Sequence, residues 1–161
     1  MAVGGLALCG AFPKVLYWNT SPSMREGLWF VAPYAHVTVG DVVAACVPER
    51  SAQWARKHAV LRDGQCPGGV DPILKRVVAL EGDRVQISRL GIVVNGKRIP
   101  QTEQNPTLDT GKDCGRNGPV PTTALDRILH AGEVVLVGDA RHRSWDSRYI
   151  GPITDVVAVL I

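Results

Sequence analysis

Residues 71–85 read DPILKRVVALEGDRV and contain the run of residues that decides the fold. The apolar stretch 73–80 follows Asp-Pro and ends at Glu-Gly-Asp, and this combination is typical of a strand bounded by turns. Because alternate side chains of a strand point to opposite faces, Lys75 shares a face with Ile73, whereas Arg76 lies on the other face. The segment therefore predicts a strand that carries one cation on each face.

Six further segments have the same character, with short runs rich in Val, Ile and Leu bounded by Gly, Pro, Asp and Asn. They cover 28–34, 41–47, 83–88, 91–99, 133–139 and 155–161. Asn95-Gly96, inside one of these runs, is the preferred sequence of a two-residue type I′ hairpin turn. Only 52–61 and 122–129 have helical character. We therefore expect a mainly β fold with few short helices.

The length of 161 residues suits one domain with one sizeable core. We expect an apolar N-terminal segment over 1–16 and a folded domain over 17–161. Residues 100–125 are rich in Thr, Gly, Pro, Asn and Asp, which predicts a variable surface loop leaving the core. Charged residues make up 20% of the chain and the formal net charge is +3, so there is no basic excess of the kind that binds nucleic acid.

The N-terminal twelve residues, MAVGGLALCGAF, are continuously apolar and end before Pro13-Lys14. A helix that spans a bilayer needs about 20 such residues, so this segment is too short to cross unaided. It also lacks the charged start and the small-residue cleavage site of a secretory leader. We interpret it as part of a longer membrane anchor or as a segment that enters one leaflet; a buried core element is the alternative.

Four cysteines, Cys9, Cys46, Cys66 and Cys114, can pair in three ways. No CxxC spacing is present, which argues against a zinc site, and we expect no metal and no other cofactor. Cys66 and Cys114 both lie in Gly- and Pro-rich sequence that a disulfide would tether, so we expect this pair to bond if the domain lies outside the cytoplasm. Two unpaired loop thiols are the alternative.

Residues 19–30 read NTSPSMREGLWF and place Ser21 and Ser23 on either side of a proline. The proline biases Ser21 toward an extended conformation, and a turn of this kind can present one hydroxyl at the edge of a strand. A serine beside a proline is usually an ordinary turn residue. This segment alone therefore identifies no nucleophile.

Lys75 is the one cation of its predicted strand that can act as a base. Arg76 does not lose its proton in a protein, whereas the pKa of a lysine falls readily when apolar neighbours desolvate its ammonium group. A neutral lysine can take the proton of a serine hydroxyl directly, without a histidine. A strand lysine with its amine in water is the alternative.

Residues 137–153 read VGDARHRSWDSRYIGPI and form a dense polar cluster between two apolar segments. This density indicates a hydrogen-bonded wall of a site, in which Asp146 and Arg148 can form a fixed ion pair. A solvated surface loop is the alternative. The four histidines lie in ordinary polar contexts and no serine lies in a GxSxG elbow, so a Ser–His mechanism is not favoured.

Three of these segments together resemble the conserved boxes of type I signal peptidases: SPSM followed by GL, then KRVVALEGDRV, then GDARHRSWDSRYIG. The resemblance runs from about Asn19 to Gly151 and implies a signal-peptidase-like β fold. It implies that Ser23 is the nucleophile and that Lys75 is the general base. The residues that it implies to be supporting are Ser144, which would orient the lysine amine, and Asp139, Asp146 and Arg148, which would hold the site together.

The resemblance also implies an oxyanion hole built from the Ser23 backbone N–H and a side-chain hydroxyl, for which Ser21 is the candidate. Met24 and Leu28 are expected to contact substrate. Leu28 and its neighbours are alternatively a lipid-facing rim or core. The sequence departs from the family pattern at Arg25-Glu26, since type I signal peptidases usually have a proline shortly after the methionine.

Three features are more similar to the TraF-type peptidases of conjugative transfer systems than to type I signal peptidases in general. They are the short NTSPSM…GLW segment, the CPGGVDPILKRV stretch and the small size of the chain. The TraF-type enzymes process the pilin precursor during assembly of the mating pilus, and some join its ends into a cyclic subunit. The similarity implies a serine endopeptidase at the bacterial inner membrane, with its catalytic domain on the periplasmic side. Its implied partners are pilin or another secreted precursor, and membrane lipid through the N-terminal segment.

Two alternatives stay open at this point. One is a general type I signal peptidase that removes leader peptides by hydrolysis. The other is a pilus-assembly subunit that keeps the fold and only binds pilin, although the joint presence of Ser23, Lys75 and Ser144 argues against it. Hydrolysis and cyclisation both follow from an acyl-enzyme, and the residues do not choose between them.

Overall fold

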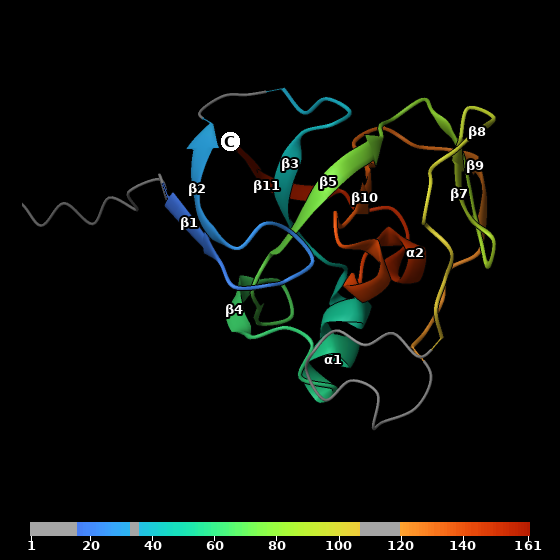
Figure 1. The fold of residues 1–161 in the computed structure, drawn as a ribbon. Coiled ribbons are helices and arrows are strands. Elements are labelled where there is room, and N and C mark those ends of the chain that lie inside the picture. Colours follow the sequence, from blue (N-terminus) through green and yellow to red (C-terminus); the bar gives the residue numbers. More distant parts are fainter. Residues whose placement is uncertain (1–15, 33–35, 107–119) are drawn as a thin grey trace, which may run out of the picture.

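The computed structural model describes residues 16–32, 36–106 and 120–161, and the elements in this part of the chain form two antiparallel β-sheets with two short α-helices (Figure 1). The first sheet has the strand order β1-β2-β11-β3-β5-β10. In sequence order its strands are β1 (Leu16–Asn19), β2 (Gly27–Ala32), β3 (Val42–Cys46), β5 (Ile73–Ala79), β10 (Val135–Val137) and β11 (Asp155–Leu160). The expected mainly β fold is confirmed.

The second sheet has four strands in the order β8-β7-β6-β9. These are β6 (Arg84–Ser88), β7 (Gly91–Val94), β8 (Lys97–Arg98) and β9 (Leu125–Ile128). Asn95 and Gly96 join β7 to β8, and both have positive φ angles, of 49° and 79°. A type I′ turn requires this conformation at both central residues, so the predicted hairpin is present.

The remaining elements are short and lie beside the first sheet. They are α1 (Glu49–Lys57), β4 (Asp63–Cys66), the 3-10 turn Arg141–Arg143 and α2 (Ser147–Ile150). The helix expected over 52–61 corresponds to α1. In the described residues, no helix is both long enough and apolar enough to cross a bilayer.

The helix expected over 122–129 is wrong, because the segment forms strand β9. Leu125–Ile128 pairs antiparallel with β6, and Leu125 lies opposite Ile87. Side chains along β9 alternate between half-buried and exposed, and Leu125 packs against the core of the second sheet. An available strand edge and one buried apolar face therefore outweigh local helix propensity here.

Strand β5 lies between β3 and β10 and separates its two cations as expected. Lys75 is opposite Val43 of β3 and is only 4% exposed. Its face belongs to the largest apolar cluster, which also contains Ile73 and Val77. The Arg76 side chain is 38% exposed and forms an ion pair with Asp139. The sheet therefore buries one lysine amine among apolar neighbours.

The disulfide joins Cys46 to Cys66, so the expected Cys66–Cys114 pair is wrong. Cys46 ends β3 and Cys66 ends β4, and the fold places the two buried residues side by side although 20 positions separate them. Loop composition could not reveal this proximity, because it depends on how β4 returns past α1 to the end of β3. Cys9 and Cys114 lie outside the described residues.

The loop expected over 100–125 contacts the folded body at both of its described ends. The Thr102 hydroxyl is buried and accepts a hydrogen bond from Ile92 N at 2.9 Å. Gln104 Nε2 donates to Thr123 O at 2.6 Å and to Arg148 O at 2.8 Å. The Thr102 contact ties the start of the loop to β7, and the Gln104 contacts join both ends of the loop to α2. Residues 107–119 lie outside the described part of the chain.

Candidate active site

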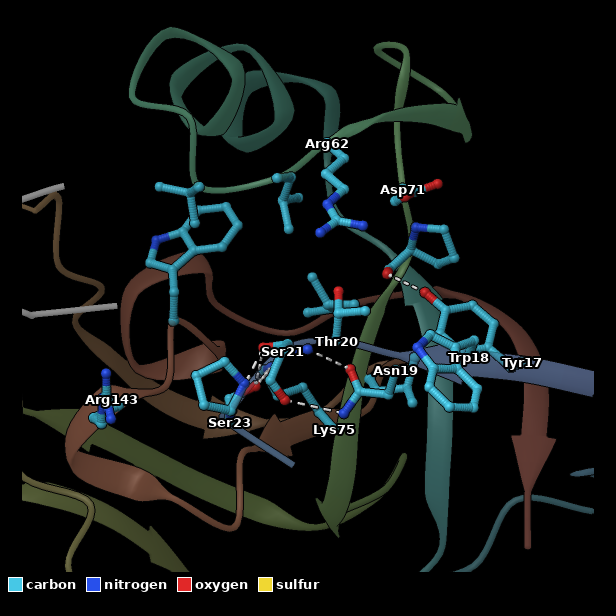
Figure 2. Close-up of a pocket in the computed structure, with 17 residues that line it drawn as sticks. Tyr17, Trp18, Asn19, Thr20, Ser21, Ser23, Arg62, Asp71, Lys75 and Arg143 are labelled. Carbon is cyan, nitrogen blue, oxygen red and sulfur yellow. Dashed lines mark hydrogen bonds between the residues drawn. The ribbon is translucent and has the colours of Figure 1, made fainter. Parts of the chain in front are cut away.

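A pocket opens where the turn between β1 and β2 meets β5 (Figure 2). One side is the turn itself, and the other is the segment between α1 and β5, with Arg143 and Trp145 completing the wall. The lining includes both Ser23 and Lys75. Other lining side chains that the sequence did not single out include Tyr17, Asn19, Arg62, Asp71 and Trp145.

Ser23 and Lys75 meet in this pocket although 52 positions separate them. Lys75 Nζ donates a hydrogen bond to Ser23 Oγ at 2.7 Å. The two residues are only 3% and 4% exposed. A neutral amine at this distance is within reach of the hydroxyl proton, so the arrangement is able to activate the serine without a histidine. None of the four histidines lines the pocket.

Burial lowers the pKa of Lys75 from 10.5 to about 8, because the ammonium loses its hydration shell inside the protein. The nearby charges act in both directions: Asp146 and Asp139 raise the pKa, and Arg148 lowers it. Desolvation is the largest of these effects. A pKa near 8 leaves a substantial fraction of the amine neutral at mildly alkaline pH, as a general base requires.

We expect the kcat/KM of this site to rise with pH and to level off above about pH 8. Below the pKa of about 8, each unit of pH multiplies the neutral fraction of Lys75 roughly tenfold, and only that fraction can accept the hydroxyl proton. Initial rates on a peptide substrate between pH 6 and about pH 9.5 measure this profile. A profile that is flat over this range would contradict the assignment of Lys75 as the base.

The Ser21 hydroxyl lies beside the Ser23 hydroxyl. Ser21 Oγ is 2.9 Å from Ser23 Oγ, and Ser23 N donates to Ser21 Oγ at 3.4 Å. The two donors expected for an oxyanion hole, the Ser23 N–H and the Ser21 hydroxyl, are therefore adjacent. Both groups are donors of the kind that stabilises negative charge on a carbonyl oxygen, and in this structure the N–H is directed at the Ser21 hydroxyl.

Ser144 is fully buried, and its hydroxyl has no hydrogen-bond partner among the described residues. No hydrogen bond joins it to Lys75, so its expected orienting role stays a prediction. A Cβ added at Gly138 would collide with the Ser144 hydroxyl and lie 2.9 Å from Ser23 O. Gly138 therefore permits the close approach of these two serines, and the sequence analysis did not single it out.

Asp146 and Arg148 form the predicted ion pair, and both are buried. Arg148 Nε donates to Asp146 Oδ1 at 2.8 Å, and Nη2 donates to Asp146 Oδ2 at 2.9 Å. Arg148 also donates to three backbone carbonyls, those of Ser144, Arg141 and Glu103. The pair thus fixes the backbone of the polar cluster rather than facing the pocket.

Asp139 attaches this cluster to β5 through Arg76. Two hydrogen bonds of 2.7 Å join the guanidinium to the carboxylate. The hydrogen bonds from Arg76 lower the pKa of Asp139. The next residue, Ala140, donates its backbone N–H to Ser23 O at 3.1 Å. Asp139 therefore lies where the polar cluster meets the turn that carries Ser23.

Met24 lies in the core, which corrects the expectation that its side chain contacts substrate. It is 3% exposed and packs with Trp29 and Leu74 in a separate apolar cluster. Its sulfur accepts a hydrogen bond from Asp139 N at 3.3 Å. Leu28 is 40% exposed but does not line the pocket. The buried Met24 side chain thus anchors the turn between β1 and β2 to the core.

The chain belongs to the signal peptidase family. The family model described as "Signal peptidase, peptidase S26" matches residues 5–159, nearly the whole sequence. This match confirms that the sequence resembles signal peptidases.

Several relatives are conjugal transfer proteins. The chain is 36% identical over 143 residues to "Conjugal transfer protein TraF" of Agrobacterium tumefaciens, covering 85% of this chain and 74% of that protein. It is 33% identical over 159 residues to "Plasmid transfer protein TraF" of Escherichia coli, covering 95% of this chain and 86% of that protein. The similarity to TraF proteins is therefore confirmed.

Among solved structures, a signal peptidase I from Enterococcus faecalis aligns with 79% of this chain and 98% of its own. The alignment has a TM-score of 0.44 and 19% sequence identity.

Proposed function

We propose that this protein is a membrane-associated serine endopeptidase that processes a pilin precursor in conjugative transfer, with Ser23 as nucleophile and Lys75 as general base. The observation that carries the proposal is the 2.7 Å hydrogen bond between the two side chains inside a pocket. Two further facts support it: the chain belongs to a peptidase family, and relatives are named for conjugal transfer.

The reaction starts when neutral Lys75 takes the proton of Ser23 Oγ as that oxygen attacks the carbonyl carbon of the scissile peptide. The negative charge that forms on the carbonyl oxygen is held by the Ser23 N–H and the Ser21 hydroxyl. The C–N bond then breaks, the lysine returns its proton to the leaving amine, and an acyl-enzyme remains. No histidine or metal ion takes part in this sequence.

The acyl-enzyme is resolved by a nucleophile that reaches the same carbonyl. Water gives a linear product with a new carboxylate, and Lys75 again accepts the proton of the attacking group. The precursor's own N-terminal amine, if held at the same place, gives a cyclic product instead. The two outcomes use one site and differ in which group is positioned there.

An apolar face next to the nucleophile turn supports membrane association. Leu16 lies opposite Phe30 and Trp18 lies opposite Leu28 across β1 and β2, so these side chains share one face. They are 49%, 52%, 68% and 40% exposed, respectively, and Ile161, 70% exposed, is hydrogen-bonded to Phe30 through its backbone. Exposed clusters of large apolar residues mark interaction sites, and aromatic side chains favour the lipid interface.

We therefore propose that this face rests on the bilayer with the nucleophile turn beside it. Replacing Trp18 and Phe30 together by serine should lower binding to vesicles of phosphatidylethanolamine and phosphatidylglycerol by at least about tenfold, because each large apolar side chain contributes about 2 kcal/mol on burial. Co-sedimentation with vesicles measures the bound fraction. An unchanged bound fraction for the double variant would remove this face from the proposal.

Intact-mass analysis of a pilin precursor incubated with the protein in detergent tests the proposed reaction. The expected result is a processed product with the wild type and none with Ser23→Ala or Lys75→Ala. A product lighter than the linear fragment by one water identifies cyclisation, and the linear mass identifies hydrolysis. Cleavage of a generic leader peptide alone would favour the general signal peptidase, and cleavage of neither substrate would favour a binding subunit.

A further inference from the structure

Asn19 lies at the base of the turn that carries Ser23. It is the last residue of β1 and is paired with Gly27, the first residue of β2, so residues 20–26 form the loop between them. Asn19 is only 4% exposed, and its side chain points into the loop rather than into water (Figure 2). A buried amide needs partners for its two donors and its acceptor.

The loop backbone supplies those partners. Asn19 Nδ2 donates to Arg25 O at 2.9 Å and to Ser21 O at 3.0 Å, with a longer contact to Met24 O at 3.3 Å. Asn19 Oδ1 accepts from Ser21 N at 2.9 Å. The amide therefore holds the chain on both sides of Ser23 and uses its donor and acceptor ends together.

Other side-chain contacts also involve the loop: Ser21 Oγ lies 2.9 Å from Ser23 Oγ, and Trp29 Nε1 donates to Arg25 O at 3.0 Å. Within the turn, one backbone hydrogen bond, from Met24 N to Ser21 O, is 3.5 Å long. Ala140 N holds Ser23 O at 3.1 Å, but from a different segment of the chain. Of these groups, the Asn19 side chain makes the most hydrogen bonds to the loop backbone.

We propose that Asn19 is a positioning residue for the nucleophile: it fixes the loop so that Ser23 Oγ stays within hydrogen-bond distance of Lys75 Nζ. This inference rests on the proposed Ser–Lys reaction. Rates of positioned reactions depend steeply on geometry, and a displacement of about 1 Å at a reacting group can cost on the order of 100-fold. Asn19 touches neither reacting atom and acts through the backbone of residues 21–25.

The amide of asparagine suits this place in a way that a carboxylate does not. Asn19→Asp keeps an oxygen for the Ser21 N–H but places its second oxygen against the carbonyls of Ser21, Met24 and Arg25, which repel it. Asn19→Ala removes every one of these hydrogen bonds. Both variants should therefore loosen the loop while leaving Ser23 and Lys75 themselves unchanged.

Asn95 provides a matched control in the second sheet. Its side chain also braces a turn, since it accepts from Arg84 N at 2.9 Å and donates to Asp83 Oδ1 at 2.7 Å. It does not line the pocket. Asn95→Ala therefore removes two hydrogen bonds of an exposed turn and lowers stability without touching the loop that carries Ser23.

The test compares precursor cleavage by the wild type, Asn19→Ala, Asn19→Asp and Asn95→Ala, each shown to be folded by thermal unfolding. We expect kcat to fall about 100-fold in both Asn19 variants, a larger effect than any change in KM, because the distance between Ser23 Oγ and Lys75 Nζ governs the chemical step. Asn95→Ala should keep the wild-type kcat. Wild-type kcat in folded Asn19→Ala would overturn the inference while leaving the proposed function intact.

Amide hydrogen exchange supplies a second readout that needs no substrate. In Asn19→Ala the Ser21 amide should exchange at least about tenfold faster than in the wild type, while the Leu136 amide in the core should not change. If the wild type cleaves no precursor, the proposed function fails, and exchange still decides whether Asn19 holds the loop. Unchanged exchange at Ser21 would overturn the inference in either case.

Discussion

Replacement of Lys75 by methionine is expected to reduce kcat/KM for precursor cleavage by at least about 10³-fold, since a positioned general base commonly contributes 10² to 10⁴-fold. Among the described residues, two side chains are hydrogen-bonded to Ser23 Oγ, those of Lys75 and Ser21. Of these, only Lys75 can act as a base. Methionine has a similar length and no charge, so it fills the same buried space. Initial rates of precursor cleavage by the wild type and the variant measure the loss of kcat/KM.

The same variant should be at least as stable as the wild type, which separates a loss of chemistry from a loss of fold. Burial disfavours the ammonium form of Lys75, as its lowered pKa of about 8 indicates, and an apolar side chain removes this cost. Lys97→Met on exposed strand β8 is the control and should retain wild-type activity. If Lys75→Met kept more than about a tenth of the activity, another base would have to be sought.

Removal of Arg148 is expected to destabilise the fold by about 3 to 5 kcal/mol, because it leaves the buried Asp146 carboxylate without its cation. Arg148→Ala also removes the donor for three carbonyls, those of Ser144, Arg141 and Glu103. At 1% exposure for Arg148 and 0% for Asp146, water reaches neither group to compensate. Denaturant unfolding of the wild type and the variant measures the difference.

An exposed ion pair provides the comparison for this prediction. Arg84 and Asp126 are joined at 2.7 Å, but their side chains are 59% and 52% exposed. Arg84→Ala should therefore cost no more than about 1 kcal/mol. Equal losses from Arg148→Ala and Arg84→Ala would mean that burial adds nothing to the Asp146–Arg148 pair, contrary to its role in fixing the polar cluster.

The sequence was sufficient to predict the parts of the fold and site that depend on local pattern. Alternation along 73–80 separated Lys75 from Arg76, and the structure buries the first and leaves the second half-buried. The Asn95-Gly96 turn follows from residue chemistry alone. The resemblance of three segments to signal peptidases selected Ser23 and Lys75, which the fold brings to 2.7 Å.

The features that the sequence could not predict depend on contacts between distant segments. Strand β9 exists because β6 offers an edge to residues 125–128, and nothing in TTALDRIL contains that information. The partner of Cys66 is set by the return of β4 to the end of β3. Asn19 gives no signal either, because an asparagine at the end of a strand is common in turns and only its buried hydrogen bonds distinguish it.

The pocket wall opposite the turn that carries Ser23 is formed by the two ends of segment 60–72, which are joined to each other. Val60, Leu61 and Arg62 line the pocket after α1, and Asp71 and Pro72 line it before β5. A backbone hydrogen bond of 2.9 Å from Asp71 N to Arg62 O ties the two stretches together, and the disulfide holds the same region to the sheet. Ser23 lies in the turn between β1 and β2, and Lys75 lies on β5, so both are outside this segment. Directed evolution confined to this wall should therefore yield enzymes with new sequence preferences and an unaltered Ser–Lys reaction.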